Sequence, residues 1–381
     1  MKVALYHPWV YLMSGIERML VEVLARSRHD WTIYTHHHEP EATYPELRAA
    51  RIVELSPRVS VRRELRPLAH AAATMARCRL PTMEERALLV SSEGLGDLVM
   101  ARARLPAVCY CHTPLKIVHD PVTRAALVAH DRRKQVLAAA LAPAFNAADR
   151  LVWRRYRHVL ANSDETARRI AAAGLAERDR VEVLRPGVDL ARFGAGQDAA
   201  RRRRFLVAGR IMWQKNVELA IDALALARRR GLDCDLVIAG AVDVKSRPYL
   251  AELRARARGL PVTFEPDPTD ERLVELYGEA LALVFTPLNE DWGMVPLEAM
   301  AAGALVIAVD AGGPRESILH GKTGWLLPGT PAAFAERMLE VASTDATVLA
   351  PLRSSARSRA AEFGWDGFVA RLDDVMEAVA R

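Results

Sequence analysis

The sequence predicts an α/β protein built from two open parallel sheets, and three observations support that prediction. Short apolar runs alternate with amphipathic stretches along the whole chain, which is typical of parallel strands covered by helices on both faces. The 381 residues fit two domains of ordinary size. Hydrophobic residues make up 51 % of the chain and charged residues 26 %, as in folded globular proteins, so the chain can bury a sizeable core.

The predicted strands come in two series, with stretches that favour helices between them. The first series comprises residues 2–6, 31–34, 87–90, 108–111, 158–161 and 181–184. Ser163 follows the fifth of these strands directly and offers an N-cap for the next helix. The second series comprises residues 204–208, 235–239, 262–264, 281–286, 305–309 and 324–327.

A domain boundary is predicted at Gly196, because residues 192–198 contain glycine and show no periodicity. The expected domains are Rossmann-like and span residues 1–196 and 197–360. Ligands of open parallel sheets bind beyond the carboxyl ends of the strands, so two such domains facing each other across a cleft are expected to form a two-sided site.

Composition and charge exclude several classes of protein. Residues 1–196 carry 30 basic and 21 acidic side chains, a net charge of +9, whereas the remainder carries 23 and 26, a net charge of −3. The basic half lacks the interleaved aromatic residues of a nucleic-acid groove, so we expect no nucleic acid partner. Peripheral contact of this half with an anionic membrane stays open as an alternative.

Targeting signals and metal-binding patterns are not found in the sequence. The first residues do not form a signal peptide, and no apolar run approaches about 20 residues, so a cytoplasmic protein is expected, with the inner membrane face as its alternative location. The four cysteines form no C-x-x-C pair. His36, His37 and His38 are predicted to form a polar loop rather than a metal site, since consecutive side chains diverge.

The most informative stretch for function is 285–303, where a strand runs into a loop and then into a helix. Pro296 suits the first turn of that helix. Such a geometry directs free backbone amides and the positive end of the helix dipole towards a ligand. We therefore predict a diphosphate cradle at Gly293, Met294 and Val295, where Gly293 lets the backbone approach the ligand closely.

Two carboxylates frame this cradle. Glu290 lies in the loop and Glu298 is predicted in the first helical turn, so they can reach different parts of one extended ligand. A capping carboxylate at the start of the helix is the alternative for Glu298.

A second stretch, 205–216, reads as strand, glycine turn and helix start. Arg210 and Lys215 can both face a phosphate there, one as a planar fork and the other as a movable point charge. Only six of the 53 basic residues are lysines, which favours a function for Lys215.

These motifs together resemble the family-4 retaining glycosyltransferases of the GT-B fold. In the second half, the resemblance rests on Gly209-Arg210, Lys215-Asn216, Glu290 and Glu298 around Asp291-Trp292-Gly293, Ala302-Gly303, Gly312-Gly313-Pro314, Glu316, and Gly321-Lys322-Thr323-Gly324. In the first half, it rests on Ser14-Gly15-Ile16-Glu17, His112-Thr113-Pro114 and Pro186-Gly187-Val188-Asp189.

The resemblance implies a hexosyltransferase that uses a nucleotide diphosphate sugar and retains the anomeric configuration. It implies that Arg210 and Lys215 bind the diphosphate, that Glu290 contacts the donor sugar and that Glu298 holds the ribose hydroxyls. Gly209 and Asn216 would line the nucleotide site. The family is usually independent of metal, so neither a metal nor a further cofactor is expected.

The resemblance also assigns residues in the first half. His112 would lie at the end of a strand, near the sugar and the acceptor, with a structural loop histidine as the alternative. Ser14 and Gly15 would form an acceptor or phosphate loop, although Ser14 replaces a glycine that is common in the family. The motifs at 112–114 and 290–293 look most like the mannosyl-type branch, where GDP-mannose is a frequent donor; a UDP-sugar is the alternative. The acceptor is expected to be a saccharide, a lipid-linked molecule or a natural product.

Other functions remain as alternatives within the same architecture. A sugar-nucleotide epimerase, a sugar phosphorylase or a non-catalytic subunit that binds nucleotide sugars would share it. A nicotinamide dehydrogenase is disfavoured, because residues 7–10 follow the first predicted strand without its glycine fingerprint. Residues 361–381 resemble the family's closing segment and are expected to cross back onto the first domain.

Overall fold

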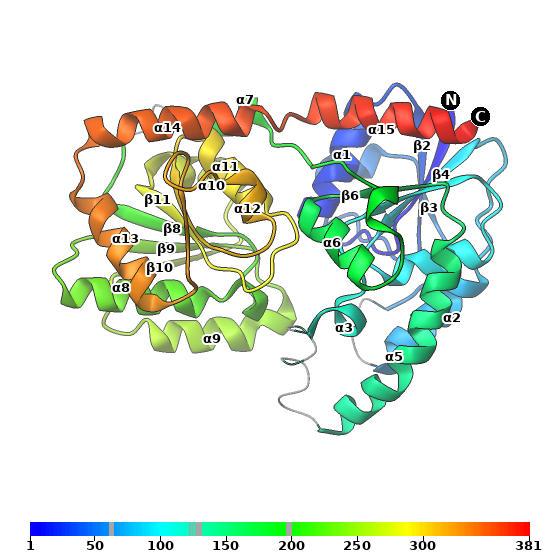
Figure 1. The fold of residues 1–381 in the computed structure, drawn as a ribbon, viewed down its shortest axis with the longest axis horizontal. Coiled ribbons are helices and arrows are strands. Elements are labelled where there is room, and N and C mark those ends of the chain that lie inside the picture. The colour runs from blue at the N-terminus through cyan, green and yellow to red at the C-terminus, as the bar shows by residue number, and fades with distance from the viewer. Residues whose placement is uncertain (61–64, 122, 124, 126–131, 196–199) are drawn as a thin grey trace. The chain divides into compact units, whose positions relative to one another are not determined.

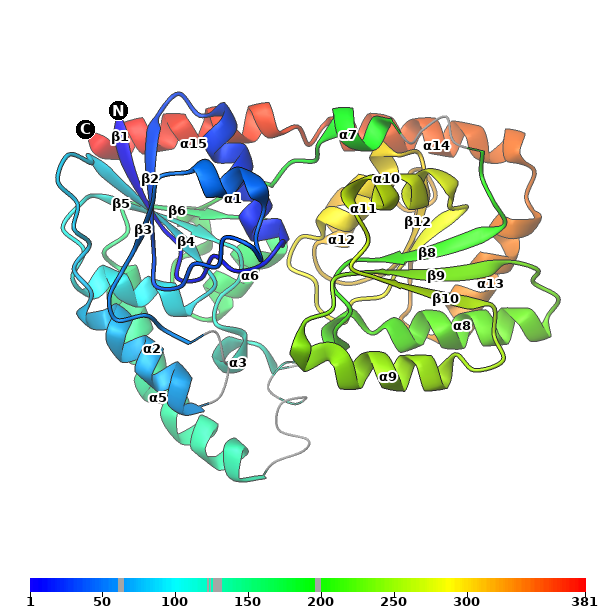
Figure 2. The ribbon, with the colours of Figure 1, turned by 180° about the vertical axis from the view of Figure 1, so that it is seen from behind.

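A computed structural model gives the fold and describes residues 1–60, 65–121, 123, 125, 132–195 and 200–381. By its internal contacts the chain divides into two compact units (Figures 1 and 2). The first unit consists of Met1–Pro186 together with Trp365–Arg381, and the second consists of Gly187–Gly364. Both are α/β units with parallel sheets, which confirms the predicted fold class.

The first unit is built on a seven-stranded sheet in the order β3-β2-β1-β4-β5-β6-β7. All its strand pairs are parallel. Its strands are β1 (Lys2–Tyr6), β2 (Asp30–Thr35), β3 (Ile52–Glu54), β4 (Ala87–Ser92), β5 (Ala107–Cys111), β6 (His158–Ala161) and β7 (Val181–Val183). Strand β3 was not predicted, because it is a three-residue edge strand with partly exposed side chains.

Helices cover both faces of this sheet. They are α1 (Gly15–Arg26), α2 (Leu65–Arg77), α3 (Lys116–His119), α5 (Arg132–Trp153), α6 (Asp164–Ala172) and α15 (Trp365–Ala380), with the short 3-10 turns η1 (Pro45–Ala49), η2 (Leu95–Ala101) and η3 (Arg178–Arg180). Side chains of α2, η2, α5 and α6 share one buried cluster with the strands. Helix α15 packs against α1, β4 and β5. The last helix of the chain therefore completes the first unit.

The second unit has a six-stranded parallel sheet in the order β10-β9-β8-β11-β12-β13. Its strands are β8 (Arg204–Ala208), β9 (Asp235–Gly240), β10 (Val262–Pro266), β11 (Ala282–Phe285), β12 (Leu305–Val309) and β13 (Trp325–Leu327). Its helices are α7 (Leu190–Gly194), α8 (Val217–Arg229), α9 (Arg247–Arg256), α10 (Asp270–Glu279), α11 (Met294–Ala301), α12 (Pro314–Ser317), α13 (Pro331–Ser343) and α14 (Ala346–Ala361), with 3-10 turns η4 (Trp213–Lys215) and η5 (Val244–Ser246).

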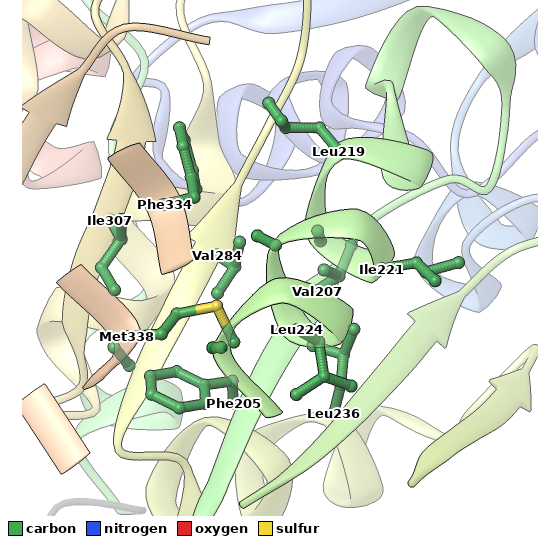
Figure 3. Close-up of a cluster of buried hydrophobic side chains, with 14 of the residues drawn as sticks. Phe205, Val207, Leu219, Ile221, Leu224, Leu236, Val284, Ile307, Phe334 and Met338 are labelled. Atoms are coloured by element: carbon green, nitrogen blue, oxygen red, sulfur yellow. The ribbon is translucent and has the colours of Figure 1, made fainter. Parts of the chain in front are cut away.

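The core of the second unit lies on both faces of its sheet. Figure 3 shows Phe334 and Met338 of α13 and Leu224 of α8 packed over the strand residues Phe205 and Val284, on one face. The adjacent strand residues Leu206 and Leu283 belong to a second cluster, which includes side chains of α10, α11 and α14. Because both faces are buried, these strands read as continuous apolar runs rather than alternating ones.

The second unit begins ahead of the boundary that the sequence predicted at Gly196. Val188 donates its backbone N–H to the Phe363 carbonyl oxygen at 2.8 Å, and Phe193 packs in the core of the second unit. By their contacts, Gly187–Gly364 belong to the second unit, and Gly196 itself lies outside the described residues.

Strand order reverses between β1 and β4 in the first sheet and between β8 and β11 in the second. The carboxyl ends of such strand pairs are the topological switch points at which open sheets bind ligands. In the second unit, the loops at this point are residues 209–216 and 286–293. None of the helices in the described part of the chain has the length and apolar character to cross a membrane.

Candidate active site

The loop after β8 is packed tightly against the end of β9. Gly209 donates its N–H to the Ala239 carbonyl oxygen at 3.1 Å. A Cβ atom at Gly240, where φ is 152°, would lie 1.8 Å from the Gly209 carbonyl oxygen. Because only glycine fits at position 240, the backbone that leads into Arg210 is fixed by the end of a neighbouring strand.

Lys215 and Glu290 form an ion pair between the two loops of the switch point. Lys215 Nζ lies 2.6 Å from Glu290 Oε2, and the two side chains are 23 % and 19 % exposed. Thr286 Oγ1 donates to the Lys215 carbonyl oxygen at 2.8 Å. The residue predicted to bind the diphosphate therefore lies directly beside the residue predicted to contact the sugar.

Gly293 ends the second loop and is the N-cap of α11, with φ of 88°. Met294 and Val295 begin the helix, where backbone amides have no acceptor within the helix. A Cβ atom at Gly293 would lie 3.3 Å from Glu290 Cγ, so the glycine allows the helix start and the carboxylate to approach each other. The predicted cradle thus lies next to Glu290.

The loop that carries Glu290 is supported from behind by a second glycine segment. Gly313 donates its N–H to the Glu290 carbonyl oxygen at 3.1 Å. A Cβ atom at Gly313 would lie 2.3 Å from the Trp292 carbonyl oxygen. This contact gives the Gly312-Gly313-Pro314 motif a structural role.

Glu298 is the fifth residue of α11, so it lies past the first turn in which the sequence placed it. Gly293 is the N-cap, and the position of Glu298 does not support the capping alternative. The Tyr277 hydroxyl of α10 donates to Glu298 Oε2 at 2.7 Å. Burial and the nearby Glu298 charge raise the pKa of Tyr277 well above its usual value, so the phenol stays protonated.

Sequence reasoning missed Tyr277. It lies in an ordinary amphipathic helix, 21 residues before Glu298, and no local motif marks it. Only the packing of α10 beside α11 brings the phenol to the carboxylate.

In the first unit, His112 lies at the end of β5, beside the β1–β4 switch point. His112 Nε2 is 2.9 Å from Ser91 Oγ, and His7 Nδ1 is 3.1 Å from the Ser91 carbonyl oxygen. Burial, with a smaller contribution from His7, lowers the pKa of His112 to about 3. The imidazole is therefore neutral near pH 7. It can donate and accept hydrogen bonds, but it cannot act as a cationic acid.

Ser14 and Gly15 begin α1 in the same unit. Ser14 is the N-cap: its Oγ accepts a hydrogen bond from Ile16 N at 3.3 Å and donates one to the Glu17 carboxylate. Burial raises the pKa of Glu17. Since α1 follows β1, this helix start belongs to the same edge of the sheet as His7.

Two of the three consecutive histidines hydrogen-bond through their rings to separate partners. His36 Nδ1 lies 3.1 Å from the Pro57 carbonyl oxygen, and His37 Nε2 lies 2.9 Å from Glu39 Oε1. Across the described ranges, no group of three or more His, Cys, Asp or Glu side chains could hold a metal ion.

Known families match both halves of the chain. Residues 15–192 match the family model Glycosyltransferase Family 4, and residues 195–362 match the model Glycosyl transferases group 1.

Several curated relatives are named D-inositol 3-phosphate glycosyltransferase. The protein from Jonesia denitrificans is 34 % identical over 229 residues, which cover 55 % of this chain and 54 % of the relative. The protein from Streptomyces bingchenggensis is 32 % identical over 311 residues, which cover 75 % and 64 %. The chain thus spans about half to two thirds of the length of these relatives.

Solved structures match over nearly the whole chain. Anabaena HepE in complex with UDP and glucose has a TM-score of 0.73 at 19 % identity, with 99 % of each chain covered. Sucrose-phosphate synthase from Thermosynechococcus elongatus has a TM-score of 0.74 at 18 % identity, with 100 % of this chain and 99 % of that chain covered.

The two parallel-sheet units and these structural neighbours show the GT-B fold. Both family models describe glycosyltransferase domains, and together they span residues 15–192 and 195–362. Residues 15–192 thus match a family 4 glycosyltransferase domain, and residues 195–362 match a group 1 domain. The mannosyl-type branch stays a prediction, since the relatives above carry a different name.

Proposed function

We propose that the protein transfers a hexosyl group from a nucleotide diphosphate sugar to an acceptor hydroxyl with retention of anomeric configuration. The observation that carries the proposal is the Lys215–Glu290 pair, 2.6 Å apart, beside the start of α11 at the switch point of the second unit. A lysine that can bind the diphosphate lies beside a carboxylate that can bind the sugar. This arrangement suits the junction between a diphosphate and its sugar.

In the proposed reaction, the bond between the anomeric carbon and the diphosphate oxygen breaks, and its electron pair leaves with the diphosphate. Arg210, Lys215 and the amides of Met294 and Val295 stabilise that developing charge. The acceptor oxygen forms the new bond on the same face of the sugar, and its proton passes to the departing diphosphate oxygen. These cations would act in place of a metal, and the reaction needs no protein nucleophile.

Glu290 and Glu298 have separate proposed roles. Glu290 contacts the sugar, and Glu298 holds the ribose hydroxyls. In the first unit, neutral His112 would bind a sugar or acceptor hydroxyl, and the Ser14-Gly15 helix start would bind an acceptor or a phosphate.

The donor is a UDP-sugar or GDP-mannose. Structural neighbours described with UDP and with UDP-glucose favour the first, and the motifs at 112–114 and 290–293 favour the second. The name of the curated relatives, together with the basic first half, favours a phosphorylated polyol as acceptor over a neutral one. A lipid-linked acceptor would place the basic half at a membrane surface.

The test is a panel of nucleotide sugars, read by thermal shift and by donor hydrolysis, with the Lys215→Ala variant beside the parent. We expect Lys215→Ala to lower turnover by at least about 100-fold, because a preorganised charge on the leaving group is lost. Its stability should fall by no more than about 1 kcal/mol, since a partly exposed ion pair contributes little. Lys245→Ala, at an exposed lysine in η5, is the matched control and should keep parental turnover.

Turnover of Lys215→Ala within a few fold of the parent would overturn the assignment. Tight donor binding by the parent without hydrolysis or transfer would instead support the non-catalytic alternative.

A further inference from the structure

We propose that Tyr277 is a positioning residue that orients the Glu298 carboxylate towards the ribose diol of the donor nucleotide. This inference rests on the proposed function, because it deepens the ribose-binding role of Glu298. Tyr277 belongs to α10 and Glu298 to α11, and no assignment from the sequence includes the tyrosine.

Three features restrict the position of Tyr277. Its ring packs edge-to-face against Phe193 of α7, with ring centroids 5.7 Å apart and an interplanar angle of 80°. Its backbone carbonyl oxygen accepts a hydrogen bond from Arg201 Nη1 at 2.8 Å. Its side chain is fully buried. The phenol oxygen is therefore fixed in space by packing and not by its contact with Glu298 alone.

This fixed phenol gives the Glu298 carboxylate a defined orientation. The hydroxyl donates to Oε2 at 2.7 Å, a distance typical of a hydrogen bond to a charged acceptor. A carboxylate rotates about its last side-chain bond unless one oxygen is anchored. With Oε2 anchored, the remaining lone pairs keep a fixed direction, which suits two vicinal hydroxyls of fixed spacing.

The phenol can serve only as a donor at this position. Burial and the Glu298 charge raise the pKa of Tyr277, so the proton remains on the phenol oxygen. A donor here keeps Glu298 an acceptor for the ribose hydroxyls. Tyr277 needs no contact with the nucleotide to have this effect.

A purely structural role for the same bond is the competing explanation, and the chain contains a matched example. In the first unit, buried Tyr156 donates to buried Asp97 Oδ1 at 2.6 Å. Tyr156→Phe removes a buried tyrosine–carboxylate hydrogen bond without involving any residue of the proposed nucleotide site.

The experiment measures dissociation constants of the full chain for UDP and 2′-deoxy-UDP, or for the GDP pair if GDP binds more tightly, by calorimetry. The parent should bind the ribonucleotide about 10-fold more tightly than the deoxyribonucleotide, because one or two hydrogen bonds to the ribose contribute about that much. Tyr277→Phe should reduce that preference to less than about 2-fold by weakening ribonucleotide binding alone. KM for the donor should rise with kcat nearly unchanged, because the contact is made equally before and during reaction.

Tyr156→Phe should lower the melting temperature but keep the parental preference. If Tyr277→Phe fails to fold, Phe193→Leu serves as the second variant: it loosens the tyrosine ring and should give an intermediate preference.

An unchanged ribose preference in Tyr277→Phe, or in Phe193→Leu if that variant is needed, would overturn the inference. A parent that turns over the donor yet binds UDP and 2′-deoxy-UDP equally would also overturn the inference. That result would remove the ribose-binding role of Glu298 but leave the proposed transfer reaction standing. A parent that binds no nucleoside diphosphate would refute the proposed function itself.

Discussion

His112 shows how burial limits the chemistry open to a single candidate residue. It is 8 % exposed, and its pKa is lowered to about 3, mainly by burial. An imidazole in this state cannot donate a proton as a cation near pH 7. The role that fits it is a neutral hydrogen-bond partner, already oriented by Ser91.

Protein stability should therefore depend on pH through His112. The imidazole titrates near 6.5 in an unfolded chain and near 3 in the folded one, so between these values the unfolded chain binds more protons. Stability is then fully present above about pH 6.5 and is lost as the pH falls, by up to about 2 kcal/mol at pH 5.

The variant His112→Asn removes this titration. Urea unfolding at pH 7 and pH 5 should show a smaller loss of stability on acidification in the variant than in the parent. An equal loss in both proteins would show that His112 does not carry this pH dependence.

The strand-to-helix segments at 209–216 and 290–298 could be predicted from the sequence, and the roles of their residues stay predictions. Tyr277 and the partners of His112 could not be predicted. Ser91 lies 21 residues from His112, and Glu298 lies 21 residues from Tyr277, so neither contact leaves a local pattern. The low pKa of His112 results from burial. The burial of a residue just after a strand cannot be predicted from the periodicity of the sequence.

At the scale of elements, strands buried on both faces are visible in the sequence as continuous apolar runs. The strand β3 was missed because it has three residues and lies at the edge of the sheet. The start of α11 was predicted from its proline and glycine, although Glu298 lies just past the first turn in which it was expected.

The close packing of Gly313 behind the Glu290 loop predicts how stability changes in two matched variants. In Gly313→Ala, the new Cβ atom would meet the Trp292 carbonyl oxygen at 2.3 Å, so the loop has to move. We expect a loss of about 1–3 kcal/mol in unfolding free energy, together with weaker binding of a nucleoside diphosphate.

Gly367→Ala is the control, because no atom lies within 4 Å of its added Cβ in α15. A helical glycine replaced by alanine should gain up to about 1 kcal/mol. Chemical denaturation measures both variants. Parental stability in Gly313→Ala would contradict the packing argument.

At the scale of the whole molecule, the first unit is assembled from two distant segments of the chain. Asp373 of α15 is 2 % exposed and accepts hydrogen bonds from Ser27 Oγ at 2.6 Å and Arg28 N at 3.0 Å. The sequence shows a break in periodicity at 192–198, whereas the contacts assign Gly187–Gly364 to the second unit.

Calorimetry of the full chain should resolve the two units. Asp373→Ala removes a buried acceptor from two partly buried hydrogen bonds and should destabilise the first unit by about 1–3 kcal/mol. The nucleoside diphosphate should raise only the other transition, because the residues proposed to bind it lie in the second unit.

Asp366→Ala is the control from the same helix. Its side chain is 87 % exposed and pairs with Arg26, so its loss should change either transition little. Equal shifts of both transitions in Asp373→Ala would contradict the assignment of α15 to the first unit.

A crystal structure of the protein with a bound nucleoside diphosphate sugar would locate the donor site. We expect the diphosphate at Arg210, Lys215 and the amides of Met294 and Val295, with the sugar at Glu290 and the ribose at Glu298. A donor bound at any other place in the second unit, or in the first unit alone, would contradict it.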